Sequence, residues 1–332
     1  MPGLAPVAAL PNGEAWLAGA CGLRARVTPS TVVEYTAPRR KIHSDIGGMK
    51  LDCDGQASYA TVAATSATVA YFAGSTRCGL DPNGIFARPI EYFDGQKFRD
   101  LPGGVLAKDA RQQAPDQLRL GASQSYVLAR GDDSLGLHEC GVYGLSQGRL
   151  SLLRACKPPE PGGTSETFSS LGIDPAGGVW VAAHRFAADA GEGPGTPFLL
   201  HIDGLKSREE GPADSGVLTQ ASDRTLWLFG KKAWRLTPQG WQPSPMPIPS
   251  DAHDFAVNND QDVWLATEQG VLHFDGTALS RVPFAPPDEN ASTTNITING
   301  GHVWANDNLN VWELLRADEP VPAPFMKHYG GE

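Results

Sequence analysis

The chain has 332 residues, of which 41% are hydrophobic and 19% are charged, a composition typical of a folded protein rather than a disordered one. Its net charge of −10 argues against nucleic acid and anionic membranes as partners, because both bind positively charged surfaces. No apolar run approaches the roughly 20 residues that a membrane-spanning helix needs, so we expect no membrane insertion.

The start of the chain carries no targeting signal. Residues 1–6 contain neither a basic segment nor an apolar stretch of the kind that marks a secretory leader. We therefore expect no leader in this chain, and we expect the first repeat to begin at about Val7.

Seven short strands with a central aromatic residue follow one another along the chain. Successive aromatic residues lie 37 to 55 positions apart, and small or branched apolar residues flank each of them. A period of roughly 40 to 50 residues that is rich in short strands is typical of a β-propeller. The sequence therefore predicts an all-β protein, a seven-bladed β-propeller of four-stranded antiparallel blades that forms one domain over residues 1–332. The central aromatic residues, which we expect in the core because of their large area, are Trp16, Tyr71, Tyr126, Trp180, Trp227, Trp264 and Trp304.

The connections of the predicted blades differ in length. In a four-stranded blade, the loop after the second strand and the connection to the next blade share one face of the propeller. We expect both kinds of connection to be long around blades 2, 3 and 4, at residues 38–57, 75–88, 102–117, 131–139 and 184–196. Long loops on a rigid scaffold often carry function, so this sector of one face is the predicted binding site.

Charged and imidazole side chains within these segments are the candidate ligand contacts. Arg77, Arg88 and Arg185 can pair with carboxylate or phosphate groups, and His138 and His184 lie in the same segments. The alternative is ordinary charge pairing on the surface of an acidic protein. The candidates for a divalent metal ion are His43, His138, His184 and His253. No two of these histidines have the spacing of a metal site, so we expect no cofactor.

Cys140 and Cys156 flank two apolar segments with a turn near Gly148. Residues directly opposed in an antiparallel pair have Cβ atoms about 4.5–5.5 Å apart, which a disulfide can close. The sequence therefore predicts a Cys140–Cys156 disulfide and an oxidising compartment, with two buried free thiols as the alternative. For Cys21, Cys53 and Cys78, one further pair and one free thiol is the simplest outcome.

Residues 254–283 are the cleanest copy of the repeat. They predict strands at 255–257, 263–267, 270–274 and 278–282, with Asp275-Gly276 as a hairpin turn. The dipeptide recurs at 94–95 and 203–204. In the last blade we expect strands at 295–298, 303–306 and 311–315. Its outer strand would come from 324–329 or from the residues before Val7, and the C-terminal segment is the favoured choice.

The strands at 263–267 and 270–275 resemble the two-component-regulator propeller repeat, in which an apolar–Trp–Leu–small–Thr strand precedes a Gly-apolar strand that ends near Asp. Residues 178–183 and 301–305 match this pattern in part. The resemblance implies a propeller of the kind found in extracytoplasmic sensor domains and in other secreted propellers.

The chain contains no P-loop, no G-x-S-x-G motif and no dinucleotide fingerprint. The leading hypothesis is a monomeric, extracytoplasmic binding propeller (periplasmic, cell-surface or secreted) that holds a protein, peptide or glycan with the long loops of blades 2–4. One alternative is a metal-dependent propeller lyase or hydrolase with its site at the top of the central channel. Another is a structural module that serves assembly. The sequence does not identify the ligand.

Overall fold

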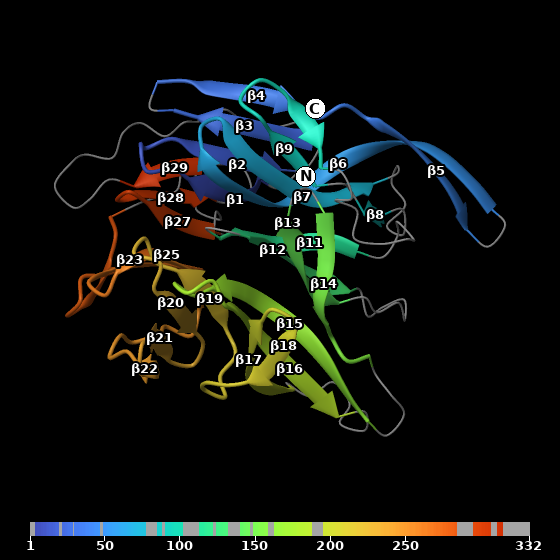
Figure 1. Cartoon of the computed structure of the whole chain (residues 1–332). Helices are drawn as coiled ribbons and strands as arrows, with labels where there is room; N and C mark the ends of the chain where they lie inside the picture. The colour runs from blue at the N-terminus through green and yellow to red at the C-terminus, as the bar shows by residue number, and fades with distance from the viewer. Residues whose placement is uncertain are drawn as a thin grey trace.

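The computed structural model describes residues 4–19, 22–28, 30–46, 49–77, 85–87, 90–101, 113–121, 124–131, 140–146, 149–158, 163–187, 195–283, 295–306 and 311–314. In these residues the chain forms only strands and turns, without an α-helix. The strands make seven antiparallel sheets that are arranged as a seven-bladed β-propeller (Figure 1). The predicted fold class is therefore confirmed.

Within each blade the strands lie side by side in chain order, from the centre of the ring outwards. Blade 1 consists of β1 (Leu4–Ala9), β2 (Ala15–Gly19), β3 (Leu23–Val27) and β4 (Val32–Thr36). Blade 2 consists of β6 (Met49–Ser66), β7 (Val69–Arg77), β9 (Glu91–Phe93) and β10 (Phe98–Asp100), with β5 (Arg40–Ile46) beside β6 and β8 (Ile85–Ala87) beside β7. Blade 3 consists of β11 (Gln113–Leu120), β12 (Ser125–Gly131), β13 (Gly141–Ser146) and β14 (Arg149–Ala155).

The remaining blades follow the same plan. Blade 4 consists of β15 (Thr164–Ile173), β16 (Val179–Ala187), β17 (Thr196–Asp203) and β18 (Lys206–Glu209). Blade 5 consists of β19 (Val217–Gln220), β20 (Leu226–Phe229), β21 (Ala233–Thr237) and β22 (Gly240–Pro243). Blade 6 consists of β23 (Ala252–Asn259), β24 (Asp262–Thr267), β25 (Gly270–Phe274) and β26 (Leu279–Arg281). Blade 7 has three described strands, β27 (Asn295–Asn299), β28 (His302–Asn306) and β29 (Val311–Leu314).

Polar bonds near the centre of the ring join each blade to the next. At all seven junctions a side chain bonds a backbone group of the neighbouring blade, so backbone groups at the blade junctions find partners that an isolated blade does not offer them. The bonds are Trp16 Nε1 to Ser66 O (3.3 Å), Leu118 N to Thr61 Oγ1 (3.3 Å), Leu171 N to Gln117 Oε1 (2.9 Å), Leu218 N to Ser170 Oγ (2.9 Å), Thr219 Oγ1 to Phe255 O (3.1 Å), Ile296 N to Asp254 Oδ2 (2.8 Å) and Asn299 Nδ2 to Ala9 O (3.0 Å).

The aromatic residues of the second strands fill the wedges between blades. Six of the seven are at most 8% exposed, as expected for core residues. Tyr71 departs from the prediction, because it is half-buried and stacks on Tyr92 of its own blade. The adjacent Phe72 takes the fully buried position and meets the Trp16 ring edge-on at 5.7 Å.

Blades 4 and 6 hold their central tryptophan in the same way. In blade 6, Trp264 Nε1 donates to Asp262 (2.7 Å), and the His273 ring lies against the indole at 4.4 Å. In blade 4, Trp180 Nε1 donates to Asp174 (3.0 Å), and the His201 ring stacks on the indole at 4.3 Å. Each histidine sits directly opposite its tryptophan in the sheet register, so the repeat itself sets the contact.

Side-chain packing closes the ring in the described part of the chain, where blades 7 and 1 share no sheet. Trp304 is fully buried among Val7, Ala9 and neighbouring residues of blade 1. At Gly300 a Cβ would lie 2.6 Å from the Cα of Pro11, so the backbones of the two blades approach closely at this turn. The outer strand of blade 7 that we predicted at 324–329 lies outside the described residues.

The segments that we expected to be long loops are partly strands, which corrects the prediction. The segment 38–57 contains most of the β5–β6 hairpin, which reaches out from the ring at the right of Figure 1. Ile46 pairs with Met49 across Gly47-Gly48, a dipeptide that favours two-residue hairpin turns. Pairing also runs further than expected in β7, β11, β12, β16 and β17, because a ladder satisfies backbone groups that an irregular loop leaves to water. Other residues of these segments lie outside the described part.

The structure contains the predicted Cys140–Cys156 disulfide, with the two Cα atoms 5.2 Å apart. The bridge ties the start of β13 to the end of β14, and the Cys156 amide donates to Cys140 O (2.8 Å). The turn lies between the paired residues Ser146 and Arg149, as the sequence predicted. Cys21 and Cys78 and the side chain of Cys53 lie outside the described part of the chain, so their pairing stays a prediction.

Replacing Trp264 with Ala should lower the free energy of unfolding by about 3–5 kcal/mol, because it empties the wedge between blades 6 and 7. Chemical denaturation followed by tryptophan fluorescence or circular dichroism measures this loss. Leu205→Ala is the matched control, since Leu205 is 84% exposed and its removal should change stability by less than about 0.5 kcal/mol. Equal effects of the two substitutions would contradict the packing role.

The double substitution Cys140→Ser and Cys156→Ser should lower stability by about 2–4 kcal/mol, because the bridge restricts a 16-residue separation in the unfolded chain. Denaturation curves with and without reductant measure the effect. The wild type should lose stability in reductant, whereas the double variant should not respond.

Candidate functional site

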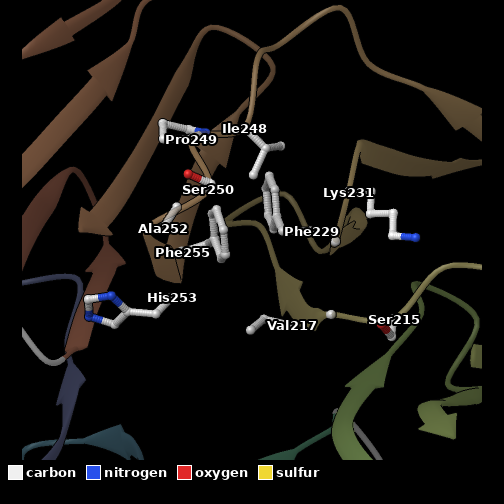
Figure 2. Close-up of a pocket in the computed structure, with 12 residues that line it drawn as sticks. Ser215, Val217, Phe229, Lys231, Ile248, Pro249, Ser250, Ala252, His253 and Phe255 are labelled. Atoms are coloured by element: carbon white, nitrogen blue, oxygen red, sulfur yellow. The ribbon is translucent and has the colours of Figure 1, made fainter. Parts of the chain in front are cut away.

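A pocket of about 500 Å³ opens between blades 5 and 6 on the upper face, which we define as the end of the ring where second strands finish and third strands begin (Figure 2). Three short stretches line it, namely 215–217 at the start of β19, 229–231 after β20, and 248–255 at the passage into β23. The connection between β20 and β21 has three residues, so no long loop of blade 5 covers the opening.

Two stacked phenylalanine rings form the floor of this pocket. The Phe229 and Phe255 rings are 4.3 Å apart and nearly parallel, and Trp227 continues the stack at 5.7 Å from Phe229. Figure 2 shows the phenylalanine pair at the centre of the pocket, between His253 and Lys231. The partly exposed side chains of Val217 and Ile248 complete the apolar surface, so the pocket suits an apolar group.

Close backbone contacts shape the rim next to blade 5. At Gly216 a Cβ would lie 1.7 Å from Phe229 O, so only glycine allows β19 and β20 to start and end this close together. The buried carboxylate of Asp214 accepts from the Ser215 amide (2.9 Å), the Lys231 amide (3.1 Å) and Trp234 Nε1 (3.0 Å). These bonds hold the rim in place and occupy the carboxylate.

The lining of the pocket carries a cationic side chain although the chain as a whole is acidic. Its lining residues include Lys231 and His253 but no aspartate or glutamate. Within the described residues the Lys231 ammonium group forms no ion pair. The exposed His253 ring lies 3.2 Å from Asp251 O. A pocket with this lining favours an apolar group that carries a negative charge.

Arg185, a predicted ligand contact, belongs to a group of charged residues on blades 3 and 4. Its guanidinium pairs with the buried Glu166 (3.2 Å), which also pairs with Arg154 (2.7 Å) and Lys157 (3.8 Å). Arg185 also pairs with Glu209 and lowers the pKa of that carboxyl through the hydrogen bond. These pairs fit the alternative of charge pairing that the sequence left open, and a ligand contact of Arg185 stays a prediction.

Among the other predicted residues, the structure describes the side chains of His184 and His253. His184 is half-buried next to Arg185 on β16, and burial lowers the pKa of its imidazole. His253 lies at the pocket between blades 5 and 6, away from the sector predicted for the site. For His43 on β5 and Arg77 on β7 only the backbone is described, and Arg88 and His138 lie outside the described residues.

The described residues contain no group of three or more His, Cys, Asp or Glu side chains that could hold a metal ion. His184 and His253 belong to different blades and do not meet in such a group. The parts of the chain that could unite His43 with His138 are not described, so that prediction stays open. No described helix has the length and apolar character needed to cross a membrane.

Two residues of opposite charge lie on innermost strands, β11 and β23. Arg119 of blade 3 and Asp254 of blade 6 belong to the inner strands of blades that are not neighbours, and their charges interact. Burial raises the pKa of Asp254 to about 6, against the lowering effect of its bonds to the Ile296 and Phe255 amides and of Arg119. Burial also lowers the pKa of Arg119.

Comparison with known proteins supports the fold and does not identify a family. No protein-family model matches the chain, and no curated protein sequence matches it. The resemblance of single blades to the two-component-regulator propeller repeat therefore stays a prediction.

Solved structures share the propeller architecture at low identity. YCF48 bound to D1 peptide is 13% identical, over 92% of this chain and 89% of that chain, with a TM-score of 0.53. PorZ, a surface component of the type-IX secretion system of Porphyromonas gingivalis, is 10% identical with a TM-score of 0.55, and the match spans 97% of this chain but 39% of PorZ. An ulvan lyase is 11% identical over 94% of each chain, with a TM-score of 0.50. These identities show the fold alone.

Asp254→Asn should remove a pH dependence of stability. The folded chain protonates Asp254 below about pH 6, whereas the unfolded chain does so only below the ordinary value of 3.8. Between these values the folded state binds more protons, so the contribution of Asp254 to stability rises as the pH falls. Asn cannot titrate but keeps an acceptor for the Ile296 amide.

Denaturation curves of both proteins at several pH values between 7 and 4 measure this difference. The wild type should gain stability relative to the variant as the pH falls, while all other carboxylates contribute equally to both. Parallel curves would show that Asp254 titrates normally.

Proposed function

We propose that this chain is an extracytoplasmic binding propeller that holds a protein or peptide on its upper face, with an apolar side chain of the partner in the pocket between blades 5 and 6. The observation that carries the proposal is the pocket itself, a hollow of about 500 Å³ with an apolar floor and Lys231 at its edge. Such hollows are the usual form of a binding site on a rigid scaffold.

The chemistry of the pocket selects its occupant. Burial of an aliphatic or aromatic side chain against the phenylalanine floor, Val217 and Ile248 stabilises the complex by about 25 cal/mol for each Å² of apolar area. Lys231 and His253 at opposite sides of the floor favour a carboxylate beside that group. A peptide offers both features within one or two residues.

The paired strands of blades 2, 3 and 4 extend the same face and offer a second area of contact. The end of β7 pairs with β6 and β8, and the end of β16 pairs with β15 and β17, so rigid strands and not only loops frame this sector. We propose Arg77, Arg88, His138 and His184 as contacts in this area. Arg185 is better placed to orient Glu166 and Glu209 than to bind a partner directly.

Two further observations support the proposal. The Cys140–Cys156 disulfide favours an oxidising compartment, which agrees with an extracytoplasmic location. Among the structures of the same fold, one is described with a bound peptide and another as a bacterial surface component. A glycan is the second candidate partner, because an ulvan lyase shares the fold, but the basic apolar pocket favours the peptide.

Ala252→Trp tests the proposed pocket, because Ala252 is half-buried in its lining and an indole there would fill the hollow. Peptides selected against the wild type from a displayed random library should lose at least tenfold in affinity for this variant. Lys206→Glu, an exposed change in the turn of blade 4, is the matched control and should leave the affinity unchanged.

Thermal unfolding of the three proteins accompanies the affinity measurements, so that loss of the fold is not mistaken for loss of the site. Selected peptides should share an apolar residue next to a carboxylate. Peptides that bind the folded Ala252→Trp variant as well as the wild type would place the site elsewhere.

A further inference from the structure

A second pocket, of about 330 Å³, lies on the lower face of the ring, where first strands finish and second strands begin. Leu120, Ile173 and Pro175 give it apolar walls from blades 3 and 4, and Arg224 of blade 5 lies at its edge. It is separate from the pocket between blades 5 and 6, because the two are at opposite ends of the strands.

Arg224 occupies a backbone position that blades 1 and 4 give to glycine. The turns between first and second strands in blades 1, 4 and 5 share one bonding pattern, in which the fourth residue donates its amide to the carbonyl of the first. These bonds are Gly13 N to Leu10 O (3.2 Å), Gly177 N to Asp174 O (3.0 Å) and Arg224 N to Ala221 O (2.8 Å). The donors have φ values of 77°, 92° and 70°, and Arg224 is the one residue other than glycine with positive φ in the described part of the chain.

A side chain in this left-handed conformation lowers the stability of the fold, because its Cβ crowds the backbone. The repeat offers glycine as the unstrained solution at the same place. Strain of this kind persists mainly where the side chain has a function.

Within the described residues the guanidinium of Arg224 makes no ion pair and no hydrogen bond. The side chain is exposed. The one carboxylate that lines the pocket is already in use. Asp174 accepts from the amides of Ala176 (2.9 Å) and Gly178 (2.8 Å) and from Trp180 Nε1 (3.0 Å). The pocket therefore presents an unused cation beside apolar walls.

We propose that this pocket binds a small organic carboxylate, with Arg224 holding the carboxylate and the walls of Leu120, Ile173 and Pro175 covering an apolar body. A planar guanidinium matches a carboxylate through two parallel hydrogen bonds. A volume of about 330 Å³ suits a small ligand, since ligand pockets range over roughly 300–1,000 Å³. The nearby charge of Asp174 favours a singly charged ligand over a phosphate, which carries more negative charge.

The test uses benzoate and N-acetyl-leucine as probes, with benzamide and N-acetyl-leucinamide as neutral partners of the same shape. Titration calorimetry or ligand-observed NMR measures binding to the whole chain. Binding of benzoate indicates a free acid as the natural ligand, and binding of N-acetyl-leucine indicates the end of a peptide. Equal binding of an acid and its amide, or binding of neither acid, would overturn the proposal.

Arg224→Gly separates this function from a structural role, because the two make opposite predictions. The variant should bind the acids at least tenfold more weakly, and its melting temperature should rise by about 1–3 °C as the strain is relieved. Arg224→Asn, which tolerates the left-handed conformation, should also lose binding without a fall in melting temperature. A variant that retains acid binding, or that melts at a lower temperature, would contradict the proposed role.

Ala252→Trp is the control that keeps the two proposed sites apart. It fills the pocket on the upper face, which also favours an apolar acid. Acid binding that remains in this variant therefore belongs to the lower pocket, and it should be lost when Arg224→Gly is added. If Ala252→Trp abolishes acid binding while Arg224→Gly does not, the carboxylate site belongs to the upper face and the proposed pocket on the lower face is wrong.

Discussion

The structure depends on the contacts between neighbouring blades near the centre of the ring. A four-stranded blade has two faces and cannot bury either of them alone, so each blade relies on the next for its core. The polar bonds at the seven junctions, from Trp16–Ser66 round to Asn299–Ala9, fix how the inner strands sit against one another. They place the aromatic residues of the second strands in the wedges, where Trp304 and Trp16 are fully buried.

The same constraint explains where variation is allowed. Packing between blades constrains the residues of the inner strands and of the wedges, whereas it constrains the residues at the strand ends less. On the upper face, β6 and β7 of blade 2 and β16 of blade 4 are long strands. Blades 5 and 6 have short connections there, and a hollow lies over Phe229 and Phe255. On the lower face, blade 5 replaces a turn glycine with Arg224. These departures from the repeat leave all seven junction bonds in place.

The sequence predicted the site less well than the fold, and the reason is physical. The length of the connecting segments predicted a site at blades 2–4. Length alone does not show that residues 40–46 and 184–187 pair as strands, or that Arg185 forms an ion pair with Glu166. The sequence did not predict the pocket between blades 5 and 6, because the prediction relied on long connections and this pocket lies beside short ones. The one signal that pointed to it was the pair of closely placed glycines, Gly216 and Gly230, beside aromatic strands.

The sequence by itself determined the number of blades, the strands of blade 6, the three described strands of blade 7, the buried tryptophans and the Cys140–Cys156 bridge. These features follow from local pattern, because strand period, Asp-Gly turns and hairpin register act over a few residues. Only the tertiary structure decided which side chains from different blades come together, such as Phe229 with Phe255 and Arg224 with the walls of blades 3 and 4. Such contacts depend on the angle between neighbouring blades, which is set by the packing of the whole ring and by no single segment.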